Sequence, residues 1–136
     1  MVEINITYEG DLHCRAIHGP SGVVIETDAP VDNQGRGESF SPTDLLATSL
    51  GVCNLTLMGI YARGHNIDLM GTKVRVEKHM TKEPPRRVER LVVEINLPEG
   101  IPAEKRKALE HAALTCPVAL SLNPEIEVDT SFNYPD

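Results

Sequence analysis

The chain has 136 residues and a net charge of −7, and 40% of its residues are hydrophobic although only 4% are aromatic. This length suits one domain with an aliphatic core, and the acidic charge argues against a nucleic acid partner because phosphates would be repelled. Three cysteines without close spacing are not typical of a secreted disulfide framework. The first residues have the pattern of a strand rather than of a signal peptide. We therefore expect a single cytoplasmic domain over residues 1–136 with reduced thiols.

The first forty residues predict an antiparallel meander followed by a loop. Apolar and polar residues alternate over 2–8, which predicts a half-buried strand. Two further strands are expected over 12–17 and 23–27, separated by turns. The Gly- and Pro-rich stretch 28–41 has too few apolar residues to pack by itself, and loops of this length are often functional.

A long helix is predicted next. Ser41 is a favourable N-cap, Pro42 suits the first helical position, and Asp44 completes a capping-box-like pattern. The helix is expected to run to Arg63, with Gly64 as its C-cap. Nearly every face of this helix is apolar. A helix of this kind lies either in a protein core or in a membrane, and we expect a central core helix that a second subunit also covers.

The remaining residues predict an alternation of strands and helices. The expected ranges are strands at 73–80 and 88–97, helices at 103–115 and 117–122, and a last strand at 125–133. The alternation in the second of these strands slips once, between Val88 and Leu91. The resulting order βββ-α-ββ-α-α-β indicates an α+β fold.

The cysteines are the candidates for chemistry. Cys53 lies in the middle of the predicted core helix, where a buried cysteine usually acts as a small apolar residue. Cys116 precedes Pro117, which would start a new helix, so Cys116 is expected near a helix N-terminus, where the partial positive charge favours a thiolate. Packing at a bend is the alternative for Cys116. Cys14 is expected to pack on its strand, and the scattered histidines predict no metal site.

The run from Gly35 to Cys53, GRGESFSPTDLLATSLGVC, resembles the OsmC/Ohr family of osmotically inducible protein C and organic hydroperoxide resistance protein. In that family a Gly-rich loop precedes Ser-Pro or Asn-Pro, an acidic residue, apolar and small residues, and a cysteine. The stretch 116–118, Cys-Pro-Val, resembles the second motif of the family, and the order of elements matches along the whole chain. The resemblance implies antiparallel sheets packed around a long central helix, in an intertwined homodimer with active sites at the subunit interface.

The resemblance also implies a peroxidase mechanism with a role in oxidative stress. Cys53 matches the peroxide-attacking cysteine, and Cys116 matches the resolving one. The Cys53 thiolate would attack a peroxide oxygen and become a sulfenic acid, with which Cys116 would condense to a disulfide. A dithiol reductant, lipoyl-linked in Ohr-type members, would then restore the thiols. No metal and no organic cofactor is implied.

A cysteine at mid-helix needs a cation nearby, because burial raises the pKa of a thiol and the helix dipole acts only near the helix ends. The family uses an arginine held by a carboxylate. Arg36 in the Gly-rich loop is the first candidate and Arg15 the second, with a solvated surface arginine as the alternative for either. The best-studied members have Glu directly after the proline, where this chain has Thr43 and then Asp44. Asp44 is either the carboxylate or a helix cap, so the hydroperoxide reductase assignment becomes less specific.

Apolar side chains near Cys53 predict an interface pocket that favours organic or fatty hydroperoxides over hydrogen peroxide. The expected lining residues are Phe40, Leu50, Leu57 and Met58. The first alternative is a non-catalytic dimer of this fold that binds a small apolar or thiol-bearing ligand. The second is another thiolate enzyme, such as an acyl transferase or hydrolase, which needs a histidine base beside the cysteine. His111, about one helical turn before Cys116, is the candidate for that base.

Overall fold

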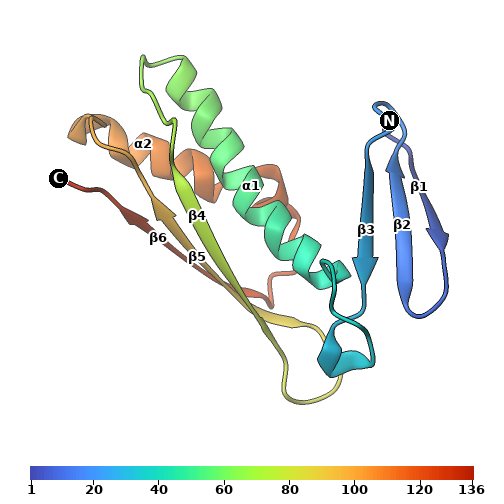
Figure 1. Cartoon of the computed structure of the whole chain (residues 1–136). Coiled ribbons are helices and arrows are strands. Elements are labelled where there is room, and N and C mark those ends of the chain that lie inside the picture. Colours follow the sequence, from blue (N-terminus) through green and yellow to red (C-terminus); the bar gives the residue numbers. More distant parts are fainter. The chain divides into compact units, whose positions relative to one another are not determined.

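The computed structural model describes all residues 1–136 (Figure 1). The chain divides into two compact units, residues 1–46 and residues 47–136, and each contains a three-stranded sheet. The elements follow the predicted order βββ-α-ββ-α-α-β, with one short 3-10 turn in addition. The α+β prediction is confirmed.

The first unit is an antiparallel sheet in the order β1-β2-β3. Its strands are β1 (Ile4–Tyr8), β2 (His13–His18) and β3 (Val24–Asp28), each within two residues of its predicted bounds. The prediction that the first strand is half-buried is wrong, because all five residues of β1 are exposed in the single chain. Alternation identified a strand with one apolar face, and that face is open to solvent.

The Gly-rich loop after β3 folds back on itself. It contains the 3-10 turn η1 (Val31–Asn33), and the N–H of Gly35 donates to the carbonyl of Pro30 at 3.0 Å. A Cβ atom at Gly35 would lie 1.8 Å from the carbonyl oxygen of Ala29, so only glycine fits at this position. The glycines of this loop therefore allow a close backbone approach directly beside Arg36.

The long helix α1 (Pro42–Arg63) begins and ends where the sequence predicts. The N–H of Ser41 donates to Oδ2 of Asp44 at 2.9 Å, and the N–H of Asp44 donates to Oγ of Ser41 at 3.1 Å. These two bonds form the predicted capping box. Gly64 follows the last helical residue, whereas the residue with left-handed backbone after the helix is Asn66, with φ 54°.

The second unit contains a mixed sheet in the order β4-β5-β6. Strand β4 (Lys73–Met80) is antiparallel to β5 (Val88–Asn96), and β6 (Glu127–Asn133) is parallel to β5. The central strand β5 supplies much of the core because both of its neighbours pair with it. Its buried residues are Val88, Leu91, Val93 and Ile95.

The slip that the sequence predicts in β5 is a β-bulge. Met80 pairs with Val88, but the preceding residue His79 pairs with Arg90. One extra residue, Glu89, therefore lies in β5 at this point, and the alternation of buried side chains changes phase there.

Helix α1 and helix α2 (Ala103–Leu114) lie beside this sheet, and the short helix α3 (Pro117–Ser121) follows α2 (Figure 1). The buried residues of α1 recur every three or four positions, as expected for one helical face. They are Ala47, Leu50, Gly51, Asn54, Met58 and Ala62. Although α1 is long and apolar enough by composition to cross a membrane, it is a partly buried core helix.

Candidate functional site

Cys53 lies on the flank of α1, between the buried stripe of the helix and its exposed face. Its side chain is half-buried, and Leu57, one helical turn later, is half-buried on the same flank. The other predicted pocket residues do not lie on this half-buried flank of α1. Leu50 and Met58 are fully buried in the core, and Phe40 is exposed ahead of the helix. Leu57 is thus the predicted pocket residue on α1 that shares the environment of Cys53.

Cys116 is the N-cap of α3. Its backbone is extended, Pro117 occupies the first helical turn, and the N–H of Ala119 donates to Sγ at 3.4 Å. This confirms the predicted position of Cys116 at a helix N-terminus. The side chain is 0% exposed, so it is also a core residue.

The fold brings these two cysteines together although they are far apart in the sequence. The side chains of Cys116 and Cys53 lie close enough that Cys53 influences the pKa of the Cys116 thiol. Burial raises the pKa of the Cys116 thiol, and the N–H groups of Ala119 and Val118 offset this rise only in part. The contact with Cys53 raises the pKa further. The expectation that the helix N-terminus favours a thiolate at Cys116 is therefore wrong, because desolvation outweighs the N–H groups.

Asn54 is a site residue that the sequence analysis missed. It is 2% exposed, and its Nδ2 donates to the carbonyl of Ala113 at 2.9 Å and to Sγ of Cys116 at 3.4 Å. Its Oδ1 is buried without a hydrogen-bond partner. The available signal is an asparagine on a buried helical stripe whose other residues are all apolar. Asn54 ties α1 to the junction between α2 and α3, where the resolving cysteine is expected.

The residues predicted to stabilise the Cys53 thiolate all belong to the first unit. Arg36 forms an ion pair with Asp11, with Nη2 to Oδ2 at 2.9 Å, and both side chains are exposed. Arg15 is an exposed residue of β2. Asp44 takes part in the capping box at the start of α1. The roles of these three residues at Cys53 stay predictions.

A histidine surrounded by carboxylates also lies in the first unit. Nδ1 of His13 is 2.6 Å from Oδ1 of Asp28, and Nε2 is 3.2 Å from Glu26 and 3.6 Å from Glu9. The bonds with Asp28 and then Glu26 raise the pKa of His13. The ligand atoms of Glu9, His13 and Glu26 lie within 4.8 Å of one another, as in a metal site. A protonated imidazole that donates from both nitrogens accounts for this arrangement without a metal.

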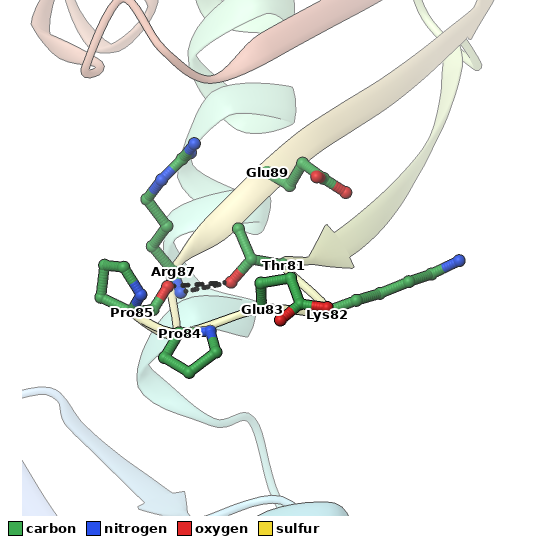
Figure 2. Close-up of a pocket in the computed structure, with 7 residues that line it drawn as sticks. All are labelled: Thr81, Lys82, Glu83, Pro84, Pro85, Arg87 and Glu89. Carbon is green, nitrogen blue, oxygen red and sulfur yellow. Dashed lines mark hydrogen bonds between the residues drawn. The ribbon is translucent and has the colours of Figure 1, made fainter.

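A hollow of about 400 Å³ lies at the hairpin between β4 and β5 (Figure 2). It is lined by Thr81, Lys82, Glu83, Pro84, Pro85, Arg87 and Glu89. Oγ1 of Thr81 donates to the carbonyl of Pro85 and accepts from the N–H of Arg87, each at 3.1 Å, which closes the hairpin. The lining carries charges of both signs and no cysteine, so this hollow does not belong to the thiol site.

A family model described as OsmC-like protein matches residues 35–131. The chain belongs to the OsmC-like protein family. The matched range includes Cys53, Cys116, Arg36 and Asp44, whereas Arg15 lies outside it. The sequence resemblance to OsmC and Ohr proteins is thereby confirmed.

Solved structures agree with this assignment. A Psychrobacter arcticus 273-4 protein, proposed to be an osmotic stress induced and detoxification response protein, is 47% identical with a TM-score of 0.92, and the match covers 98% of this chain and 96% of that one. An organic hydroperoxide resistance protein OsmC from Legionella pneumophila is 15% identical, with a TM-score of 0.77 and coverages of 98% and 96%.

A third OsmC-like structure comes from Vibrio cholerae. This protein, proposed to confer organic hydroperoxide resistance, has captopril bound in one of its active sites. It is 16% identical with a TM-score of 0.74, and the match covers 96% of this chain and 91% of that one. At such identities the Legionella and Vibrio structures show a shared fold alone. No curated protein matches the sequence of this OsmC-like chain.

The geometry of the OsmC-like chain does not favour a cysteine–histidine pair. His111 is exposed on α2, where its carbonyl accepts from the N–H and Oγ1 of Thr115 at 3.1 and 2.8 Å. Cys116, in contrast, is fully buried. The two cysteines, and not a thiol with a histidine, are the side chains that the fold brings together.

Proposed function

We propose that this OsmC-like protein is a thiol-dependent peroxidase that reduces organic hydroperoxides, fatty ones included. The observation that carries the proposal is the proximity of the Cys53 and Cys116 side chains, close enough for Cys53 to raise the pKa of the Cys116 thiol. The difference in burial supports the roles that we propose for them. Half-buried Cys53 is open to a substrate, while fully buried Cys116 has a raised pKa and stays protonated until a sulfenic acid forms beside it.

The reaction has three steps. The Cys53 thiolate attacks a hydroperoxide oxygen, the O–O bond breaks, and the alkoxide takes a proton and leaves as an alcohol, so that Cys53 becomes a sulfenic acid. The sulfur of Cys116 then attacks the sulfur of Cys53. The S–S bond forms as the Cys116 proton and the Cys53 hydroxyl leave as water. A dithiol, lipoyl-linked in our proposal, finally reduces the disulfide by exchange and is itself oxidised.

We assign the cation that stabilises the Cys53 thiolate to Arg36, with Arg15 as the second candidate and Asp44 as a carboxylate that orients it. The ion pair of Arg36 with Asp11 is exposed, and such pairs contribute about 0–1 kcal/mol, so Arg36 can exchange partners at little cost. The rate at which iodoacetamide alkylates Cys53 tests this assignment. A slower rate in Arg36→Ala but not in Arg15→Ala supports Arg36, and the reverse supports Arg15.

We further propose that residues 1–136 act as one OsmC-like domain in a cytoplasmic, intertwined homodimer. The exposed apolar face of the first sheet supports a second copy as the partner, since Ile4, Ile6 and Tyr8 are 59%, 68% and 63% exposed. The outer face of α1 also carries exposed apolar residues, Val52 and Ile60. The protein needs neither a metal nor an organic cofactor in this scheme.

Counting free thiols before and after peroxide treatment tests the function. Reduced protein is mixed with cumene hydroperoxide or with hydrogen peroxide, and thiols are titrated. The wild type should lose two thiols, faster with cumene hydroperoxide, and Cys53→Ser should lose none. Cys116→Ser should accumulate a sulfenic acid that dimedone traps. Cys14→Ser serves as the matched control and should behave like the wild type, whereas an unchanged thiol count in the wild type would contradict the proposal.

The second candidate function is non-catalytic binding of a small apolar or thiol-bearing ligand. The captopril found in an active site of the Vibrio relative favours it, because captopril is a thiol. A protein of this kind would bind captopril in calorimetry, would lose this binding in Cys53→Ser, and would keep all its thiols in the presence of peroxide. Loss of two thiols in the wild type excludes this candidate as the sole function.

A further inference from the structure

We propose that Asn54 is a positioning residue for disulfide formation, because its amide holds the sulfur of Cys116 against Cys53 and stabilises that sulfur as it becomes a thiolate. This inference rests on the proposed peroxidase function and adds a residue to its second step. Asn54 directly follows Cys53 on α1. One rigid helix therefore carries both the sulfur that is oxidised and the group that orients its partner.

The orientation of the amide is fixed by its surroundings. One Nδ2 hydrogen donates to the carbonyl of Ala113 at 2.9 Å, and the other donates to Sγ of Cys116 at 3.4 Å. A half-turn of the amide would place Oδ1 against the carbonyl oxygen of Ala113, so two acceptors would face each other. The amide must therefore present an N–H, and not an oxygen, to the sulfur of Cys116.

The buried Oδ1 atom indicates that Asn54 has a role other than packing. This oxygen has no hydrogen-bond partner, and burying an unsatisfied acceptor is unfavourable. A leucine of similar size would fill the same place on the buried stripe without that penalty. The benefit that an asparagine provides, and a leucine cannot, is the N–H directed at Cys116.

The second step of the reaction requires such a donor. Cys116 is 0% exposed, and water cannot stabilise a negative charge that develops on its sulfur. As the Cys116 proton leaves with the Cys53 hydroxyl as water, the N–H groups of Asn54 and Ala119 face the sulfur that gains charge. Hydrogen bonds from N–H groups to an anion are stronger than those to a neutral thiol, so they favour the attacking form.

The first test measures the two steps separately in Asn54→Leu. Reduced protein is mixed with one equivalent of cumene hydroperoxide, the Cys53 sulfenic acid is trapped with dimedone at successive times, and the disulfide is quantified by mass spectrometry. Sulfenic acid should form at the wild-type rate. Disulfide formation should slow about tenfold, and its pH midpoint should rise by about one unit, as expected when one hydrogen bond to the thiolate is lost. Leu91→Met, a volume-conserving change at a fully buried residue of β5, is the matched core control and should change neither value.

The second test does not depend on peroxidase activity. In a Cys53→Ser background, the pH dependence of Cys116 alkylation is measured by peptide mass spectrometry with and without Asn54→Leu. A Cys116 pKa higher in the double variant supports the inference, and equal pKa values overturn it. A wild type inert to peroxide would overturn the proposed function, yet this comparison would still decide the role of Asn54. If Asn54→Leu does not fold, Asn54→Ala also removes the side-chain donor, and the same two outcomes for the Cys116 pKa decide.

Discussion

At the scale of a single residue, opposing interactions set the pKa of the Cys116 thiol. Complete burial raises the pKa of its thiol, the N–H of Ala119 lowers it, and the contact with Cys53 raises it again. An N-terminal helix position lowers a cysteine pKa when solvent is nearby, but α3 has five residues and the sulfur is fully buried. The net rise favours the protonated thiol of Cys116, in line with the proposal that Cys53 is the nucleophile.

His13 should make stability depend on pH. Its folded-state pKa is raised by Asp28 first and by Glu26 next, so its contribution is fully present below the unfolded value of about 6.5 and is lost as pH rises through the folded value. We expect His13→Gln to lower the melting temperature more at pH 6 than at pH 9, measured by circular dichroism. In an Asp28→Asn background this pH-dependent difference should shrink, and a difference that is the same at both pH values would contradict the prediction.

Single residues could be predicted where a local motif contained them. Cys53 and Cys116 lie in family motifs, and the capping box of Ser41 and Asp44 is a local pattern. The cluster at His13 could not be predicted, because it depends on the cross-strand register that pairs His13 with Asp28. The contact of Asn54 with Cys116 depends likewise on how α1 packs against the end of α2.

At the scale of elements, bounds were predicted well because each helix and strand has its own period and capping residues. The parallel pairing of β6 with β5 was beyond sequence patterns, since no local feature encodes which distant strand is the neighbour. The alternating pattern of β1 correctly indicated a strand but not its exposure, because the layer that would cover it does not follow from local sequence.

Gly51 controls how closely α1 packs on the second sheet. A Cβ atom at this position would lie 3.0 Å from Cγ2 of Val76 and 3.3 Å from Cγ1 of Val74. Gly51→Leu would push α1 away from β4, and we expect it to lower the free energy of unfolding by about 1–3 kcal/mol in urea titrations. Gly59→Ala is the matched control on the same helix, because a Cβ atom at Gly59 meets nothing within 4 Å. It should raise stability by about 0.5–1 kcal/mol through helix propensity, and equal effects of the two variants would contradict the packing argument.

At the scale of the whole molecule, the first sheet has an apolar face that the single chain leaves exposed. Residues directly opposite each other in antiparallel strands project to the same side, so Ile6, Ala16 and Ile25 share one face. Ile6 and Ile25 are 68% and 48% exposed, and Ile4 and Tyr8 lie on the same face. Monomeric proteins rarely expose a contiguous apolar surface of this kind, which favours burial against a second copy of the chain.

We therefore expect the wild type to be a dimer in size-exclusion chromatography with light scattering at micromolar concentration. Ile6→Glu places a charge in the middle of the apolar face, and burying that charge without a partner is costly, so the variant should shift towards monomer. Met70→Glu is the control, since Met70 is 86% exposed in the segment between α1 and β4 and belongs to no strand, and it should remain dimeric. A wild type that elutes as a monomer at every concentration would contradict the prediction that a second copy covers the apolar face. If the active site also needs both subunits, Ile6→Glu should reduce peroxide-dependent thiol loss in proportion to the monomer fraction, because the cation and the pocket at Cys53 would then be completed across the subunit interface.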